Sequence, residues 1–210
     1  MSAIVVVGGG GHAKVVINIL KKEGRHEILG YTDPRDRGVL LGNRYLGPDS
    51  SLTVLAAGPE KLNAVIALGQ VGLGVPRSTL WTRLRSIGMS FPFIVSPDAI
   101  VNQEVSGGEG AVVMDGAVIN SGATVGLGVI VNTNSTIEHD VALGEWVHVA
   151  PGATISGGVT IGSFSMIGAG ATVIEGINIA PGCNVGAGAT VVRDLTAPGV
   201  YVGTPARRIK

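Results

Sequence analysis

Residues 111–128 have the sequence AVVMDGAVINSGATVGLG, in which one unit of six residues occurs three times. Each unit starts with alanine, has Val or Ile in its third place and ends in glycine. Outward from this stretch, the chain from Ala99 to Asp194 divides into sixteen hexads without an insertion. The third place is Val, Ile or Leu in fifteen of them, with Gly107 as the exception, and the first is always Ala, Ser, Cys, Val or Ile. A short fixed period of this kind indicates a repeat fold.

A period of six fits a short strand followed by a corner, because side chains in the first and third places then point to the same face. The fourth place is often Gly or Asn, as at Gly126 and Asn132, and both residue types tolerate the positive φ of a turn. Stacked units of this type form a parallel β-helix in which each turn covers the apolar interior of the next. We therefore expect a β-helix over residues 96–210.

Residues 1–95 have a different pattern, in which short apolar runs alternate with amphipathic stretches. Strands that alternate with helices predict a small parallel α/β sheet. We expect two domains, 1–95 and 96–210, with the boundary near Ser96. The predicted strands are Ala3–Val7, Glu27–Thr32, Asn63–Leu68 and Phe91–Val95, and the predicted helices are His12–Glu23, Ser50–Ala57 and Arg77–Ile87.

The loop GGGGHA at residues 8–13 fits the G-x-G-x-x-A pattern of a phosphate-binding turn. Asp33 follows about twenty residues further on, at the end of the second predicted strand. A dinucleotide needs two such halves, whereas the rest of this chain belongs to the hexads, so a single nucleotide fits better. Glycines let a phosphate approach the backbone, and the start of the next helix supplies free N–H groups. The alternative is that the glycines only form tight turns. The expected substrate-binding residues are Gly8, Gly10, Gly11, His12, Asp33 and Gly69.

Charge and cysteine content narrow the function classes. Fifteen Lys and Arg residues balance fifteen Asp and Glu residues, so no overall field attracts nucleic acid or an anionic membrane. The apolar run near the start is short and has no basic residues before it, so we expect no signal peptide, no transmembrane helix and a cytoplasmic protein. The single cysteine, Cys183, is in the first place of a hexad and is expected to face the interior.

Three motifs together carry a family resemblance. GGGGHAKVV at 8–16, NTNSTIEHD at 132–140 and VYVGTPARR at 200–208 resemble the sugar O- and N-acyltransferases, which include sialic acid O-acetyltransferases and bacterial N-acetyltransferases of nucleotide-linked 4-amino sugars. The resemblance implies a left-handed, triangular β-helix with three hexads per turn, preceded by a Rossmann-like half domain that holds the nucleotide sugar. It also implies a homotrimer that uses acetyl-CoA, needs no metal and has its active sites between subunits.

The resemblance also implies roles for individual residues. His139 is the general base, and Asp140 is the carboxylate that orients it, with Glu138 as the other candidate. His148 lies near the thioester, and the N–H of Gly157 faces the acyl oxygen. Gly168 and Ala169 are further acetyl-CoA contacts. Because Cys183 is expected inside the column, we expect direct transfer to the amine of an amino sugar, without an acyl-enzyme.

The hexad phase separates the two histidines of the repeat. His139 is in the fifth place, in a corner, whereas His148 is in the second place and points out of the column. In a triangular coil, these are a corner and the opposite face. We therefore expect His139 of one chain to meet His148 of a neighbouring chain, and Trp146 to cover the seam between subunits.

Other functions remain open at this point. The same base serves a sugar hydroxyl, as in O-acetylation of sialic acid. A non-catalytic protein that only binds nucleotide sugars, or a purely structural solenoid, keeps the fold without the chemistry. A zinc hydratase on this fold needs three imidazoles, and the repeat contains only His139 and His148.

Overall fold

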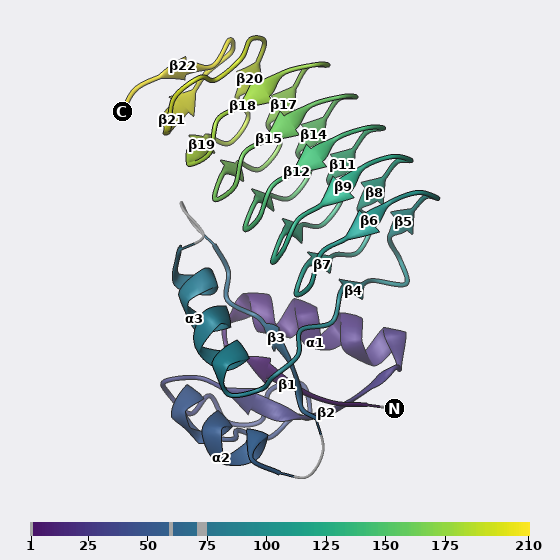
Figure 1. Cartoon of the computed structure of the whole chain (residues 1–210), viewed down its shortest axis with the longest axis vertical. Helices are drawn as coiled ribbons and strands as arrows, with labels where there is room; N and C mark the ends of the chain where they lie inside the picture. The colour runs from purple at the N-terminus through teal and green to yellow at the C-terminus, as the bar shows by residue number, and fades with distance from the viewer. Residues whose placement is uncertain (1, 59–60, 71–74) are drawn as a thin grey trace.

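The computed structural model describes all residues except 1, 59–60 and 71–74. It has an α/β unit and a β-helical column, and Figure 1 shows the column extending from one side of the α/β unit, with the C-terminus at its far end. The predicted fold class is therefore confirmed.

The α/β unit is built on a sheet of three parallel strands in the order β2-β1-β3. The central strand β1 has no solvent-exposed surface from Ile4 to Val7, because helices and loops cover both of its faces. The strands are β1 (Ser2–Val7), β2 (His26–Thr32) and β3 (Asn63–Ile66), and the helices are α1 (Gly11–Glu23), α2 (Leu52–Ala56, after a 3₁₀ turn at Asp49–Ser51) and α3 (Val75–Ser86).

The expected strand Phe91–Val95 does not belong to this sheet. Only Ser90 forms a bridge with Asn63 of β3, and the chain then leaves the α/β unit. Ile94 and Val95 form β4, which pairs with Val112 and Val113 of the column. The prediction was wrong because an apolar run of five residues does not specify which of two sheets it will join. The ladder of the column thus begins at Ile94, while the division into folding units near Ser96 stays a prediction.

The column has three sheets, one on each side. The first face contains β4 (Ile94–Val95), β7 (Val112–Val113), β10 (Ile130–Val131), β13 (His148–Val149), β16 (Met166–Ile167), β19 (Cys183–Val185), β21 (Gly199–Val202) and antiparallel β22 (Arg207–Arg208). The second face contains β5 (Ile100–Val101), β8 (Val118–Ile119), β11 (Thr136–Ile137), β14 (Thr154–Ile155), β17 (Thr172–Val173) and β20 (Thr190–Val191). The third face contains β6 (Ser106–Gly107), β9 (Thr124–Val125), β12 (Ala142–Leu143), β15 (Thr160–Ile161) and β18 (Asn178–Ile179).

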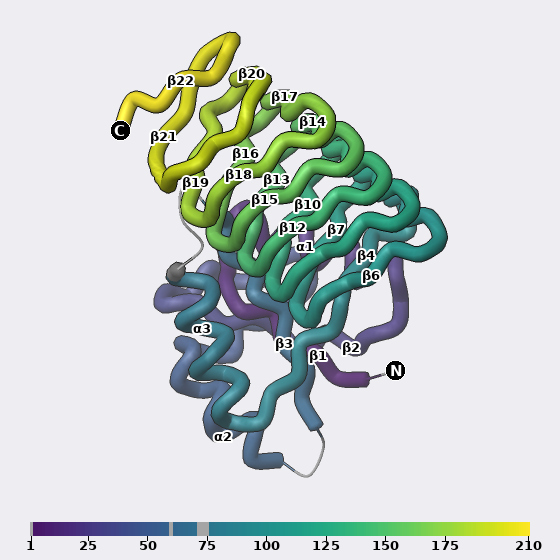
Figure 2. The backbone as a smooth tube through the Cα atoms, turned by 45° about the horizontal axis from the view of Figure 1, so that its top comes forward, coloured from purple at the N-terminus to yellow at the C-terminus, as the bar shows by residue number. Residues whose placement is uncertain are grey.

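The ladder gives the size of one turn. Ile130 pairs with Val112 on one side and His148 on the other, so partners are 18 residues, or three hexads, apart. First and third places of the hexads fill the interior, where Val129, Val131, Ile137 and Cys183 have no exposed surface. The tube view in Figure 2 shows the successive turns stacked along the column.

The glycines of the hexads have two different roles, and one differs from expectation. Positive φ occurs at the sixth place, as at Gly116 and Gly128, and even at Asp140. The fourth-place glycines have no positive φ, but a Cβ on Gly126 or Gly144 would lie 2.7 Å from the backbone of the next turn. Glycine at the fourth place is therefore needed for close approach between turns, whereas the corner itself is formed two residues later.

The α/β unit covers the lower part of the first face. Residues of α1, such as Val16 and Ile17, share a buried cluster with Val112 and Ile130 of that face. At the end of α1, Lys22 Nζ lies 2.6 Å from carboxylate oxygens of both Asp98 and Asp115. The buried cluster includes residues of the first face but not of the second or third. His148, on the first face, and His139, at the corner between the other two, therefore lie on different sides of one chain.

We expect the interior of the column, and not its outer surface, to determine stability. Ile155 of β14 has no exposed surface, whereas its neighbour Thr154 points outward. Ile155→Ala should lower the free energy of unfolding by about 2–5 kcal/mol, because it leaves a cavity between stacked turns. Thr154→Ala, the matched control, should change it by about 0.5 kcal/mol or less. Chemical denaturation measures both, and equal effects would contradict the assigned register.

Candidate active site

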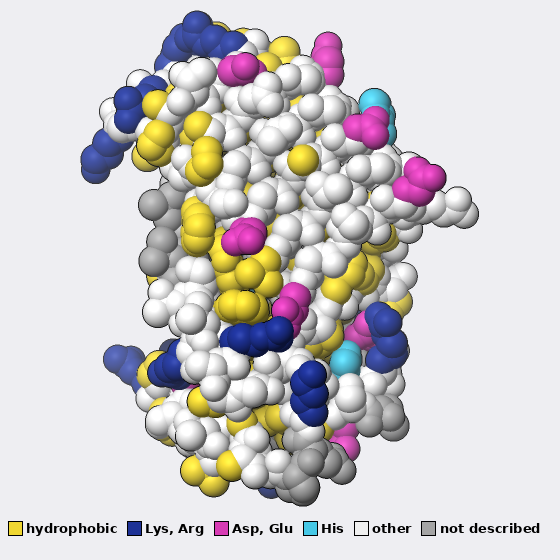
Figure 3. Space-filling view, in the orientation of Figure 1, with side chains coloured by type: hydrophobic (Ala, Val, Ile, Leu, Met, Phe, Trp, Pro, Cys, Tyr) yellow, Lys and Arg dark blue, Asp and Glu magenta, His cyan; other side chains and the backbone are white. Residues whose placement is uncertain are grey.

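A histidine and a carboxylate form a pair at an exposed corner of the column. His139 and Asp140 follow β11, between the second and third faces. His139 Nδ1 lies 2.9 Å from Asp140 Oδ2, and the two side chains are 67% and 73% exposed. Asp140 has φ of 59°, and its N–H donates to the Ser121 carbonyl, so the tight corner places this carboxylate beside the ring. In the space-filling view of Figure 3, acidic side chains and one histidine are visible on the outer edge of the column, away from the α/β unit.

Gly157 of the next turn lies directly beside the His139 ring. A Cβ at position 157 would be 2.6 Å from both Cε1 and Nε2 of His139, which is shorter than any van der Waals contact. Among the described residues, the Gly157 N–H donates no backbone hydrogen bond. The His139 ring, with its Nε2, therefore lies directly against the backbone of Gly157.

The other candidate carboxylate, Glu138, is held elsewhere. Asn102 Nδ2 donates to Asn120 Oδ1 at 2.7 Å, and Asn120 Nδ2 donates to Glu138 Oε2 at 2.9 Å. These fourth-place side chains form a ladder along the second face. The ring of His139 is thus oriented by Asp140, and Glu138 is available as a comparison.

A cavity of about 500 Å³ opens beside the glycine loop. It is lined by Gly9, Gly10, Gly11, Lys14, Arg37, Val39, Leu40 and Leu41. A Cβ on Gly10 or Gly11 would meet nothing within 4 Å, so no contact inside the chain explains these two glycines. Helix α1 starts at Gly11 without a side-chain cap, and its first N–H groups together with two cations suit a phosphate.

Two of the predicted substrate residues, Gly8 and Asp33, shape this loop and do not line the cavity. Gly8 has φ of 118°, and a Cβ there would lie 2.9 Å from the Ala67 carbonyl oxygen. Asp33 accepts hydrogen bonds from the N–H groups of Gly9 and Arg35, both at 3.0 Å, and pairs with Arg37. Burial alone raises the pKa of Asp33, but these donors together lower it below its ordinary value. Asp33 therefore braces the loop as a carboxylate.

His12 lies in a second group, between the two domains. A Cβ on Gly69 would lie 3.8 Å from the His12 Cβ, and His148 of the first face is close enough to lower the pKa of His12. His148 is only 5% exposed, because the α/β unit covers it, and its Nε2 lies 3.0 Å from Asn132 Nδ2. The outward direction expected for His148 is present, but its place at an open surface was wrong.

Both imidazoles of this interdomain group resist protonation. The pKa values of His12 and His148 are lowered to about 4, first by burial and then by the positive charge of Arg77. A backbone group of Gln70 favours the protonated form of His148, although this is the smaller effect. At neutral pH both rings are therefore uncharged.

Arg77 and Trp146 complete the interdomain group. Arg77 Nη1 donates to Gln70 Oε1 at 2.8 Å, Nη2 donates to the Gly128 carbonyl, and the guanidinium lies 5.4 Å from the Trp146 ring centre. Trp146 is 3% exposed and also packs against Trp81. The expectation that Trp146 covers a subunit seam was wrong, because α3 of the same chain covers it.

Gly168 and Ala169 follow β16, higher on the column, in the connection from the first face to the second. The Gly168 N–H donates to the Val185 carbonyl at 2.8 Å, and a Cβ there would approach Ala187. Ala169 is exposed. These positions are remote from the glycine loop. Their contact with acetyl-CoA stays a prediction.

Lys14, Arg37 and Arg77 were not predicted as site residues from the sequence. Lys14 is one turn into α1, where a helix position is compatible with a solvated lysine, and Arg37 is in an irregular stretch without a periodic signal. Arg77 is in a polar helix, and only the tertiary contacts show that it is buried. An arginine two residues into a helix carries no sequence signal for this.

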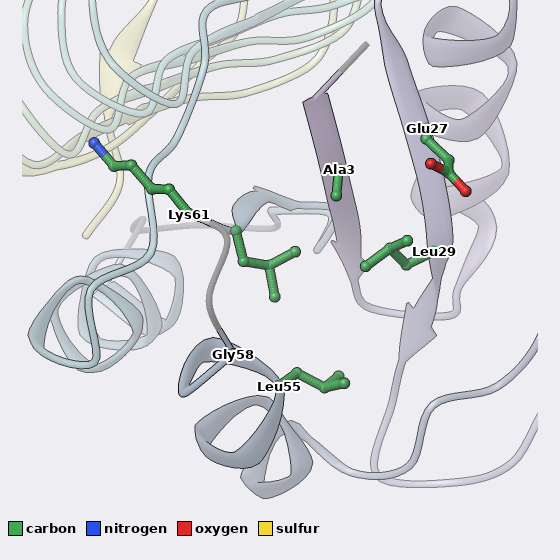
Figure 4. A pocket seen from close by; sticks show the side chains of 7 residues that line it. Ala3, Glu27, Leu29, Leu55, Gly58 and Lys61 are labelled. Carbon is green, nitrogen blue, oxygen red and sulfur yellow. The ribbon is translucent and has the colours of Figure 1, made fainter.

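A further cavity of about 300 Å³ lies near the starts of β1 and β2. Figure 4 shows Leu29 and Leu55 directed toward it, while the amino group of Lys61 points away. Its lining is mostly apolar and is far along the strands from the glycine loop, so it adds no group to the chemistry described above.

Two properties of the described residues concern membranes and metals. Nowhere in this part of the chain is a helix long and apolar enough to cross a lipid bilayer. The same residues contain no group of three or more His, Cys, Asp or Glu side chains suited to hold a metal ion.

We expect Gly157→Ala to displace the His139 ring without unfolding the column. The new methyl group would overlap the imidazole, which can rotate away because it is exposed. Ser156→Ala is the neighbouring control. Histidine ¹⁵N spectra should show a changed His139 environment in the glycine variant only, and an unchanged signal there would contradict the contact.

Acid should destabilise the protein through the interdomain histidines. A histidine with a folded pKa of about 4 and an unfolded pKa of about 6.5 stabilises the fold fully only above pH 6.5, and this contribution is lost as pH falls toward 4. Each should cost about 2 kcal/mol at pH 5 relative to pH 7. Denaturation of His148→Gln should show a smaller pH dependence than wild type, whereas His26→Gln, outside this group, should not. Equal slopes in all three proteins would rule out the buried neutral imidazole.

Comparisons with known proteins agree with this geometry. A family model, the PglD N-terminal domain, matches residues 3–73. No curated protein sequence matches the chain. Among solved structures, the acetyltransferase domain of PglB from Neisseria gonorrhoeae FA1090 is 34% identical with a TM-score of 0.92, and the match covers 100% of both chains.

Two further structures extend this comparison. PerB from Caulobacter crescentus, solved in complex with CoA and GDP-perosamine, is 34% identical with a TM-score of 0.92 over 100% of this chain and 98% of that one. WeeI from Acinetobacter baumannii AYE is 25% identical with a TM-score of 0.88 over 100% of both chains. The predicted resemblance is confirmed: this chain belongs to the family of hexapeptide-repeat sugar acyltransferases, with a Rossmann-like half domain followed by a left-handed β-helix.

Proposed function

We propose that this protein transfers an acetyl group from acetyl-CoA to the amine of a nucleotide-linked amino sugar, at sites between the subunits of a homotrimer. The observation that carries the proposal is the His139–Asp140 pair at 2.9 Å, on an exposed corner beside Gly157. The similarity to an acetyltransferase domain and to a protein that binds CoA and GDP-perosamine supports this substrate class.

His139 acts as the general base in this proposal. With its Nδ1–H donated to Asp140 Oδ2, the free lone pair is on Nε2, beside Gly157. The sugar nitrogen attacks the thioester carbonyl and loses a proton to Nε2, the C–S bond breaks, and that proton passes to the CoA thiolate. Asp140 fixes the tautomer and stabilises the imidazolium, while the Gly157 N–H faces the developing oxyanion.

The glycine-loop cavity is the proposed nucleotide site. Lys14, Arg37 and the uncapped start of α1 surround space that Gly10 and Gly11 leave open. These groups fit a diphosphate, with its charge near a helix N-terminus. The sugar then extends toward His12 and Gly69, where an uncharged imidazole meets it.

A neighbouring chain supplies the base. In one chain, the α/β unit covers the first face, whereas His139 lies on the corner between the other two faces. A sugar held by the α/β unit therefore does not reach the His139 of its own chain. A threefold arrangement brings His139 of one subunit to His12 and His148 of the next.

Acetyl-CoA lies along the column between two subunits in this arrangement. Its thioester is near Gly157 and His148, and Gly168 and Ala169 contact it further up. The basic residues Arg207, Arg208 and Lys210 at the C-terminal end suit its phosphates, and Figure 3 shows Lys and Arg side chains gathered there. The cytoplasm, where acetyl-CoA is made, is the proposed location.

The acceptor is tested directly by thiol release from acetyl-CoA. A panel of UDP-, GDP- and dTDP-linked 4-amino sugars, with sialic acid as the hydroxyl acceptor, separates N- from O-acetylation. We expect turnover with at least one nucleotide-linked amino sugar. Turnover with sialic acid alone would replace the proposal by O-acetylation, and binding without turnover would make the protein a nucleotide-sugar binder.

Substitutions of His139 and of the two neighbouring carboxylates, Asp140 and Glu138, test whether His139 is the general base. His139→Ala should lower kcat by about 10²–10⁴-fold, the usual contribution of a general base. Asp140→Asn should lower kcat by a smaller factor, because the ring stays but its orientation and charge stabilisation are lost. Glu138→Gln is the matched control and should retain activity, since Glu138 does not contact His139. Equal losses at 138 and 140 would remove the assigned role of Asp140.

Subunit mixing tests the shared site. Chains with His139→Ala and chains with His148→Ala should each be inactive, but an equal random mixture should recover about one quarter of the wild-type sites, because one intact pair needs two particular neighbours. Refolded single variants are the control. A mixture no more active than its components would show that both histidines serve a site within one chain.

A further inference from the structure

Arg77 is a buried cation to which no described residue offers an anionic partner. It is 2% exposed, and among the described residues its hydrogen bonds go to the Gln70 side chain and the Gly128 carbonyl, both uncharged. Its Nε has no partner in that part of the chain. Burial without a counter-ion lowers the pKa of the guanidinium to about 10, so Arg77 still carries its charge at neutral pH.

The contacts of Arg77 connect the two domains. The residue starts from α3 of the α/β unit, and its guanidinium reaches the corner of the column formed by Gly128 and Trp146. On its other side, it holds Gln70, next to Gly69 and His12. The planar guanidinium group donates hydrogen bonds in fixed directions and stacks on an aromatic ring, so an arginine suits this position better than a lysine would.

From this geometry we infer that Arg77 is a positioning residue for the acetyl transfer: it fixes His12 of the α/β unit and His148 of the column at one interdomain site and sets the charge that both imidazoles experience. This inference rests on the function proposed above. An uncharged imidazole can accept a proton or a hydrogen bond from a sugar amine, whereas an imidazolium would repel an ammonium.

The charged surroundings of the two imidazoles are simple. His12 comes from α1, His148 from β13 and Arg77 from α3. Arg77 lowers the pKa of both imidazoles, His148 also lowers that of His12, and no other charged group among the described residues contributes to either shift. A later cation on α3, Arg85, forms an ion pair with Glu109 of the column and lies 5.7 Å from the Trp81 ring centre. Arg85 thus offers a matched control with a similar aromatic contact and the same two domains, but with a counter-ion and 49% exposure.

The test is a pH titration of the histidines, monitored by ¹⁵N spectroscopy, in wild type, Arg77→Met and Arg85→Met. In wild type, His12 and His148 should titrate below pH 5. In Arg77→Met, both pKa values should rise by about 1 pH unit but remain below 6.5, because burial, the larger cause, is unchanged. Arg85→Met should leave them where they are. If Arg77→Met does not fold, Arg77→Gln removes the same charge.

Activity provides the second readout. Arg77→Met should lower kcat/KM about threefold more at pH 5 than at pH 8, because both imidazoles become partly protonated. Arg77→Lys should keep the titration but raise KM, since the charge remains and the double hydrogen bond is lost. A lower melting temperature with unchanged titrations and an unchanged pH profile would reduce Arg77 to a structural role and overturn the inference.

The titrations separate this inference from the proposed function. They need no substrate, so they remain decisive if no acceptor sugar is turned over. Titration of either buried histidine near 6.5 in wild type would overturn the inference without any variant. Absence of acetyl transfer, combined with the expected titrations, would instead remove the proposed reaction and leave the electrostatic arrangement standing.

Discussion

The 18-residue register of the column is the constraint on which the rest of the structure depends. Each short strand pairs only with the strands one turn above and below it, so an insertion of one residue would move the interior positions of that turn to the surface. The fourth-place glycines let successive turns approach, and the sixth-place residues turn the chain at each corner. This register also fixes the position of every functional group on the column, because the place in the hexad determines whether a side chain lies inside, on a face or at a corner.

The register separates two histidines that the proposed reaction would bring together. His139 is at a corner, beside Gly157 and Asp140, and is exposed. His148 is on the opposite face, under the α/β unit. A continuous ladder of short strands cannot close this separation within one chain, and therefore the proposed function brings the two histidines together by association of several copies. The site then inherits its precision from the rigid elements on which it stands.

The interdomain contact has a second role beyond joining two folds. It removes His12, His148 and Arg77 from water together, and the combination of burial and one unpaired positive charge favours neutral imidazoles. Lys22, bound to Asp98 and Asp115, closes another part of the same contact with ordinary exposed ion pairs. The exposed ion pairs of Lys22 contribute little to stability. The buried charge of Arg77, in contrast, changes the pKa values of the neighbouring histidines.

The sequence alone determined the β-helix, the α/β unit, the glycine loop and the His139 corner, because each depends on local spacing: a period of six, alternating strands and helices, and a histidine next to an acid. Tertiary structure alone decided where Phe91–Val95 belongs, that His148 and Trp146 are covered by α3 and its surroundings, that Asp33 braces the loop, and that Arg77 is buried. These features depend on residues far apart in the chain whose meeting is governed by the packing of one domain on the other. Periodicity specifies which side of its own element a residue faces, but it carries no information on what will cover that side.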